Sequence, residues 1–427
     1  MEAERSSDSD GSPFGWFEAI GIELEYMIVD ATSLDVRPIC DRLMEAEAGK
    51  IVADVEFDDV SWSNELTAHV VELKTTTPPP RLEGWADHFD AHLRRIRNHL
   101  QPLGARLMPG AMHPWMDPGT EMKLWPHDYR PIYEAMHRVF DCRGHGWANL
   151  QSLHINLPFR GDEEFGRLHA AIRAVLPILP ALAASSPAQD GVLTGRLDQR
   201  LMNYRHHCDR LRSMVADVVP EPVFSIDEYH ERVLGWIYRE LEPLDPEGLL
   251  RHEFANARGA IARFERSAIE IRVIDVQECP RADLAIAALA TSVVRALGEE
   301  AWGRLDDLKT LGTEPLVAIF DACIADADEA VIADRDYLDA LGIPGSTSMT
   351  AGEVWRQLRR SVERYRSDDL SAFASDLDLL FDHGPLARRL REALGDRPDR
   401  SRFASVYTEL CDALDRGELF RVPSSHG

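Results

Sequence analysis

The chain has 427 residues, of which 44% are hydrophobic and 28% charged, a balance that lets a globular protein bury a large core. Its formal net charge of -26 disfavours nucleic acid and anionic membranes as partners, because a long-range negative field repels polyanions. No stretch of about 18 uncharged apolar residues is present, so the sequence predicts no membrane-spanning helix.

The ends of the chain and its cysteines indicate where it folds and works. Residues 1–13 are acidic and Ser-rich without the basic and apolar regions of a signal peptide, so we expect a disordered tail and a cytoplasmic location. Six dispersed cysteines without a CxxC pair predict reduced thiols. No repeat or Gly/Ser linker interrupts residues 14–420, which predicts a single domain, followed by a short tail at 421–427.

Two strands and a helix are predicted first along the chain. Over residues 20–30, apolar side chains alternate with Glu23 and Glu25, the period of a half-buried strand. A second strand, residues 69–75, ends before the prolines at 78–80, because proline cannot donate to a ladder. Apolar residues at helical spacing then predict a helix over residues 85–100.

Later segments complete the predicted architecture. Residues 151–159 alternate as a third strand, and a helix interrupted by Pro177 and Pro180 follows it. Residues 268–276 form a fourth strand, and everything from Asp283 onward has helical periodicity. Strands in the first two-thirds, followed by a helical last third, predict an α+β fold with a sheet-bearing part at about 14–300 and a helical part at about 300–420.

The pair Glu23 and Glu25 is the first sign of chemistry, because residues i and i+2 of a strand project side by side from one face. Neighbouring carboxylates repel each other, and a divalent cation between them relieves the repulsion. Mg²⁺ prefers oxygen ligands of this kind. A strand with one solvated face also explains the motif, so the pair alone leaves both interpretations open.

Similar polar pairs recur on the other predicted strands. They are Glu65 with Glu72, His154 with Asn156, and Glu270 with Arg272. A polar sheet face rich in Glu, with one His and one Arg, is typical of a site that binds divalent cations and a polyphosphate. Glu65 and Glu72 have opposite strand parity, so a bulge or loop must intervene if both reach one metal ion.

Four blocks in this order resemble the carboxylate-amine ligase family that includes the type 2 glutamate–cysteine ligases, relatives of glutamine synthetase. The blocks are GIELEYMIVD (21–30), ELTAHVVELKT (65–75), SLHINLPF (152–159) and AIEIRVIDV (268–276). Several blocks in order are more specific than one motif. The resemblance implies a mainly antiparallel sheet with a funnel-like active-site face, backed by helices, as in the glutamine synthetase-like catalytic fold.

The resemblance also implies a reaction and roles for single residues. A substrate carboxylate, that of glutamate, attacks the γ-phosphate of ATP, and an amine such as that of cysteine displaces phosphate from the acyl phosphate. Arg272 and Glu270 are the implied catalytic residues, and Arg272 and Arg130 are the implied nucleotide-binding residues. The implied Mg²⁺ ligands are Glu23, Glu25, Glu65, Glu72, His154 and Glu270.

Other function classes have weaker support or stay open. No GxxxxGK[ST] loop, strand-following GxGxxG, HExxH or GxSxG motif is present, which argues against P-loop, Rossmann, zinc-protease and serine-hydrolase sites. A metal-dependent amide or phosphoester hydrolase and a non-catalytic nucleotide sensor remain alternatives, and homo-oligomerisation is open. Trp115 and Trp125 either line an acceptor pocket or pack the core. His206, His207 and Cys208 are expected at the surface, because adjacent residues do not face one centre.

Overall fold

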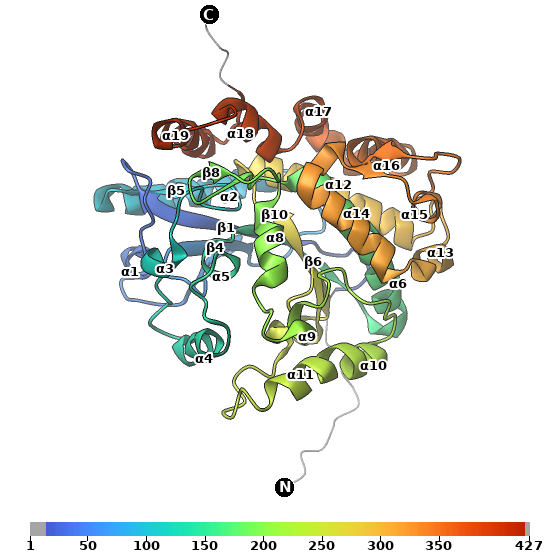
Figure 1. Ribbon diagram of the computed structural model, residues 1–427, viewed down its shortest axis with the longest axis horizontal. Coiled ribbons are helices and arrows are strands. Elements are labelled where there is room, and N and C mark those ends of the chain that lie inside the picture. Colours follow the sequence, from blue (N-terminus) through green and yellow to red (C-terminus); the bar gives the residue numbers. More distant parts are fainter. Residues whose placement is uncertain (1–13, 423–427) are drawn as a thin grey trace, which may run out of the picture.

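The computed structural model describes residues 14–422, and its architecture is α+β (Figure 1). The predicted tail at 1–13 and residues 423–427 of the C-terminal tail lie outside the described residues. Within the described part, no helix is long and apolar enough to cross a membrane.

One antiparallel sheet organises the part of the chain that the structure describes. Its strands neighbour one another in the order β2–β3–β4–β1–β6–β10–β9, and β5 pairs with the far end of β1. The central strand β1 therefore touches three others. The strands are β1 (Gly21–Asp30), β2 (Asp54–Val55), β3 (Val60–Asn64), β4 (Val70–Thr75), β5 (Ala105–Met108), β6 (Ser152–Pro158), β9 (Ala260–Arg263) and β10 (Ala268–Asp275).

Helices cover the sheet and extend beyond it. Those before β10 are α1 (Cys40–Ala48), α2 (Trp85–Leu100), α3 (Pro118–Glu121), α4 (Arg130–Phe140), α5 (His145–Ala148), α6 (Gly161–Val175), α7 (Pro180–Ala183), α8 (Gln199–His206), α9 (Arg212–Val215), α10 (Ile226–Tyr229) and α11 (Gly235–Leu241). Those after it are α12 (Pro280–Gly298), α13 (Leu305–Thr310), α14 (Thr313–Asp326), α15 (Arg335–Ala340), α16 (Ala351–Tyr365), α17 (Ala374–His383), α18 (Leu386–Leu394) and α19 (Arg400–Arg416).

The apolar face of β1 builds the main core. Ile22, Leu24, Tyr26 and Ile28 are fully buried there, in one hydrophobic cluster with residues of α2, α6 and α12. Helix α12 is apolar on nearly all sides and packs against α2, α6, α16 and α17, as expected for a helix surrounded by protein. This rigid backing holds the opposite face of the sheet in position.

The opposite face of β1 is divided along its length. Near the C-terminal end of the strand, Met27 and Val29 belong to a second hydrophobic cluster with residues of α18 and α19, the outer red helices in Figure 1. Nearer the start of the strand, Glu23 and Glu25 line a cavity. The C-terminal helices thus cover the apolar half of this face and leave the acidic half accessible.

The predicted strands are confirmed to within one or two residues, and the helix after β6 is interrupted at Pro177 and Pro180 as expected. The sequence analysis missed β3, β5 and β9, which are only four or five residues long and so shorter than every strand that it predicted. It was also wrong in making the last third wholly helical. A short hairpin, β11 (Val331–Ile332) with β12 (Met349–Thr350), lies there, where β-branched residues pair ahead of the capped start of α16.

Candidate active site

The register of the sheet places the polar side chains in three rows that cross the strands. Partners directly opposite each other in neighbouring strands are close, and residues two apart in one strand share a face. The rows are Ser63–Glu72–Glu25, Lys74–Glu23–His154 and Gly21–Asn156–Glu270. The pairing of four strands thus brings together carboxylates that are up to about 250 residues apart in sequence.

Apart from Gly21 and Asn156, the residues of these rows form the floor of a cavity of about 560 Å³. Seven of the eight residues predicted for the site line it: Glu23, Glu25, Glu65, Glu72, His154, Glu270 and Arg272. The eighth, Arg130, lies exposed at the start of α4 and donates from Nε to Glu134 at 2.7 Å. Tyr129 and Tyr133 of the same segment do line the cavity, so we leave Arg130 out of the proposed site.

Glu65 reaches the cavity from a turn, as expected from its opposite strand parity to Glu72. It follows the last residue of β3, in the turn that leads to β4, whereas Glu72 lies within β4. Carboxylate oxygens of Glu25, Glu65 and Glu72 lie within 4.8 Å of one another. We call this group the carboxylate half of the site. Its geometry suits a divalent cation with oxygen ligands.

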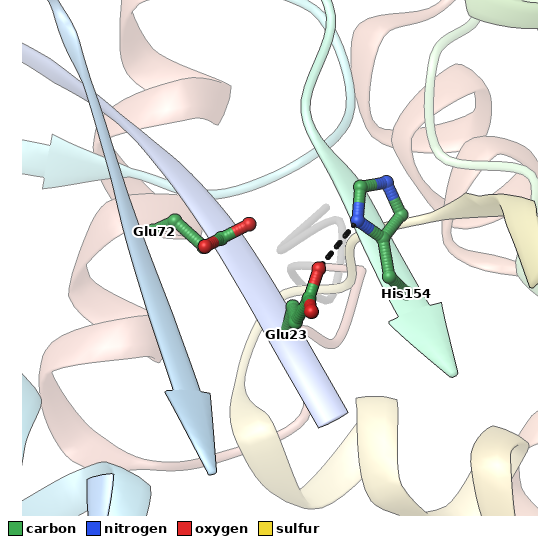
Figure 2. A group of neighbouring side chains, drawn as sticks. All are labelled: Glu23, Glu72 and His154. Atoms are coloured by element: carbon green, nitrogen blue, oxygen red, sulfur yellow. Dashed lines mark hydrogen bonds and ion pairs between the residues drawn. The ribbon is translucent and has the colours of Figure 1, made fainter. Parts of the chain in front are cut away.

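A second group of potential ligands joins three strands. Figure 2 shows Glu72 of β4, Glu23 of β1 and His154 of β6, whose ligand atoms also lie within 4.8 Å of one another. His154 Nδ1 bonds Glu23 Oε2 at 3.0 Å, and Ser152 donates from its backbone and hydroxyl to Glu25 at 2.6 and 2.9 Å. Glu23 and Glu25 of β1 are thus each oriented by a partner on β6.

Burial and like charge raise the pKa values of Glu65 and Glu72 in the carboxylate half. Burial raises the pKa of Glu65 well above its ordinary value, and the charges of Glu72 and Glu25 add to that effect. Burial and the charge of Glu23 raise the pKa of Glu72 to about 7. The protein therefore holds these carboxylates together against their mutual repulsion, which a bound cation would relieve.

His154 and Glu23 stabilise each other as an ion pair. Burial alone would lower the pKa of His154, but its hydrogen bond to Glu23 and the charges of Glu25 and Glu270 raise it to about 9. The same hydrogen bond lowers the pKa of Glu23, although burial opposes it. His154 is therefore an imidazolium at neutral pH, and it must lose a proton before it can ligate a metal ion.

Glu270, which was predicted as a metal ligand and a catalytic residue, lies in a different environment. Arg263 donates to one of its oxygens at 2.9 Å, and Arg272 donates to the other through Nε and Nη2 at 3.0 and 2.5 Å. Burial would raise its pKa, yet the charges of Arg272, His154 and Arg263 hold it well below its ordinary range. We call Glu270 with Arg263 and Arg272 the arginine half. Among the described residues, Glu270 joins neither group of potential metal ligands.

The arginine half rests on a buried network. The register between β10 and β6 shifts between Ile271 and Ile274, a bulge that re-aims the side chains around Arg272. Behind it, Arg200 of α8 is buried, and its Nε bonds Asp275 at 2.5 Å. Arg200 also lines the cavity. This fixed frame holds the arginine half in place.

The donor set fits Mg²⁺. The two groups offer several carboxylate oxygens and one imidazole at a polar cavity, and the pKa values of Glu65 and Glu72 are raised by burial and by neighbouring carboxylates. Hard oxygen ligands of this kind are those that Mg²⁺ prefers. Glu23, Glu25, Glu65 and Glu72 would hold the ion, with His154 once it is deprotonated.

Sequence reasoning missed several cations of the cavity, namely Lys74, Arg200, Arg263 and Arg266. Lys74 could have been found, because it lies two residues after Glu72 and so shares its face of the strand. Arg263 and Arg266 lie in or after β9, which showed no strand signal. Arg200 comes from a helix, and only the tertiary fold brings it to the sheet.

Three remaining expectations have clear outcomes. Trp125 is fully buried in the main core, and Trp115 packs against α19 under Arg400, so neither lines the cavity.

The surface interpretation of His207 and Cys208 was wrong. Cys208 is 1% exposed and His207 lines the cavity, because the end of α8 packs onto Trp147. All six cysteines are buried and unpaired.

Comparisons with known proteins find relatives along nearly the whole chain. The model of a family described as Glutamate-cysteine ligase family 2 (GCS2) matches residues 19–409. An uncharacterised protein of Archaeoglobus fulgidus is 35% identical over 403 residues, which cover 94% of this chain and 100% of that one. A Rubrobacter xylanophilus protein, provisionally named glutamate–cysteine ligase 2-3, is 24% identical over 66% of this chain and 70% of its own.

Solved structures share the fold. The glutamate–cysteine ligase (gshA) of Francisella tularensis in complex with AMP matches with a TM-score of 0.56 at 11% identity, covering 96% of this chain and 92% of that one. The ligase PafA in complex with the prokaryotic ubiquitin-like protein Pup matches with a TM-score of 0.50 at 12% identity, covering 95% and 78%. These matches confirm the predicted fold.

Proposed function

The chain belongs to glutamate–cysteine ligase family 2, and we propose that it joins glutamate to an amine in an ATP-dependent reaction that passes through an acyl phosphate. The observation that carries the proposal is the arrangement of one cavity floor. Unbalanced carboxylates suited to a cation lie beside a pair of arginines held by Glu270. Phosphoryl transfer requires these two kinds of charge side by side.

The residues of the arginine half would bind the triphosphate of ATP. Arg272 donates to Glu270 through Nε and Nη2, which fixes the plane of its guanidinium, and its remaining N–H groups would donate to phosphate oxygens. Arg263 lies on the other side of Glu270, and its Nε is buried without a hydrogen-bond acceptor. A phosphate oxygen would supply that acceptor. Mg²⁺ bound at the carboxylate half would neutralise charge that develops on the phosphates.

The reaction then needs no protein nucleophile. An oxygen of the glutamate side-chain carboxylate attacks the γ-phosphorus and ADP leaves, which gives an acyl phosphate. The amine attacks the acyl carbon, phosphate leaves with the bonding electrons of the C–O bond, and the amine loses a proton. Apolar side chains, namely Ile132, Met136, Trp147 and Met214, line the cavity and would exclude water from the acyl phosphate.

ADP release tests this function. The purified protein is incubated with ATP, Mg²⁺ and L-glutamate against a panel of amines that includes L-cysteine. We expect ADP release that requires the metal, the acid and an amine together, with one amide formed per ADP. Cleavage of amides or phosphoesters without ATP would instead indicate the hydrolase. ATP binding without turnover under every mixture would indicate the sensor.

A further inference from the structure

The cavity carries a cation on the side opposite its arginines. Lys74 lies on β4, in the row Lys74–Glu23–His154, and lines the cavity. Among the described lining residues that β2, β3, β4 and their connections contribute, it is the one lysine or arginine. Nothing in the proposed handling of ATP uses it.

The ammonium group of Lys74 has free donors. Its Nζ donates to Asp54 Oδ1 at 3.1 Å and lies 3.7 Å from Glu72 Oε1, beyond hydrogen-bond distance. An ammonium has three N–H groups, so two are available to a ligand. The pair with Asp54 is partly exposed, with 29% and 37% of the two side chains accessible, and exposed ion pairs of this kind are weak. Lys74 can therefore offer its two remaining N–H groups to an anion in the cavity while it stays beside Asp54 and Glu72.

The spacing of the sheet separates this cation from the arginine half. Three strand steps lie between β4 and β10, which at about 4.8 Å each is about 14 Å. An anion at Lys74 is therefore distinct from phosphates at Arg263 and Arg272. Glu23, by contrast, pairs directly with Lys74, one strand step of about 4.8 Å away. The two carboxylates of a short amino diacid have a comparable separation.

We propose that Lys74 binds the carboxylate of the donor substrate that does not react. The donor is then an amino acid with two carboxylates, one over Glu23 beside the γ-phosphate and the other at Lys74. This inference rests on the proposed ligase function for the identity of the reacting group. It makes Lys74 the residue that distinguishes a diacid from an acid with a single carboxylate.

The test pairs a substrate change with a residue change. L-Glutamate has both carboxylates, and 4-aminobutyrate lacks only the α-carboxylate. Binding of each is measured by calorimetry with Mg²⁺ present, and KM and kcat are measured separately by ADP release. For Lys74→Met we expect L-glutamate to bind about 10- to 100-fold more weakly, the value of a hydrogen bond between charged groups. Binding of 4-aminobutyrate and the KM for ATP should stay unchanged.

Two further variants control the measurement. Lys309→Met makes the same change on α13, outside the cavity, and should bind L-glutamate as the wild type does. Asp54→Asn keeps Lys74 and removes the negative charge that competes for it, so glutamate should bind more tightly, and unchanged binding would count against the role of Lys74. Because Asp54 is exposed, this variant tests the proposal even if Lys74→Met folds poorly.

The outcomes separate this inference from the ligase proposal. Glutamate binding that depends on Lys74, without ADP release, would support the role of Lys74 and contradict the ligase. ADP release with glutamate binding unchanged in Lys74→Met would support the ligase and overturn the role of Lys74. A rise in the KM for ATP alone, or a wild type that binds no glutamate, would also overturn it.

Discussion

The two halves of the cavity floor use the same residue type in opposite ways. In the carboxylate half, Glu65 and Glu72 face other carboxylates, and their pKa values are raised by burial and like charge. In the arginine half, Glu270 is more deeply buried, yet its pKa is lowered because two guanidinium groups surround it. These two environments lie only a few strands apart in the same sheet.

This contrast separates two functions that a glutamate can have in such a site. A glutamate with unbalanced charge attracts a cation from solution, whereas a glutamate with balanced charge orients a cation that belongs to the protein. Burial alone does not distinguish them, because it raises the pKa in both cases. The neighbours decide, and substitutions in the two halves should therefore have different consequences.

The largest expected effect is on catalysis in the arginine half. Arg272→Met should lower kcat about 1,000-fold, in the range found for an arginine that stabilises phosphoryl transfer. Arg272→Lys should recover only part of it, because an ammonium lacks the planar fork. Arg266→Met removes a partly exposed guanidinium at the same cavity and should cost about 10-fold or less. If Arg272→Met and Arg266→Met lowered kcat equally, the proposed role of Arg272 in phosphoryl transfer would be contradicted.

The next largest effect is expected at Glu23, which lies between the carboxylate half and the arginine half. Glu23→Gln should lower metal-dependent turnover about 100-fold, because it removes a proposed ligand and the partner of His154. The fold should persist, since Gln is nearly isosteric. Steady-state ADP release over a Mg²⁺ titration measures the loss, with the exposed Glu56→Gln as control. Turnover at the wild-type level would remove Glu23 from the site.

Stability should respond strongly to a change at Glu270. Glu270→Gln leaves Arg263 and Arg272 without their shared partner in a buried place, which should lower the free energy of unfolding by about 3 kcal/mol. Urea unfolding of the metal-free protein measures this value. A gain in stability would show that the arginines are not held by Glu270.

The smallest effect has the opposite sign. Glu65→Gln removes one of several repelling carboxylates and should raise the free energy of unfolding of the metal-free protein by about 1 kcal/mol at pH 8. A pKa raised by folding makes stability fall as pH rises above the ordinary value of 4.5, so the gain should shrink toward pH 4. The same urea series at both pH values checks it. A loss of stability at pH 8 would mean that Glu65 is already balanced.

Some residues of the site could be predicted from the alternation of polar and apolar residues along single strands. Alternation places Glu23 with Glu25, and His154 with Asn156, because a strand repeats every two residues whatever its neighbours are. The parity conflict between Glu65 and Glu72 even indicated the intervening turn. Arg130 shows the limit of this reasoning, since its position between two matching blocks carried no information about which way a short helix would turn it.

Pattern along the chain was enough to predict β1, β4, β6 and β10, their polar faces, the acidic character of the site and the family to which the chain belongs. These follow from local periodicity and from motif order, both of which are properties of neighbouring residues. The pairing of Glu270 with arginines, apart from the other carboxylates, and the place of Lys74 across the cavity from them follow from the fold of the whole chain. Strand register and the packing of α8 set those contacts, and they depend on segments too far apart in sequence for any local pattern to record.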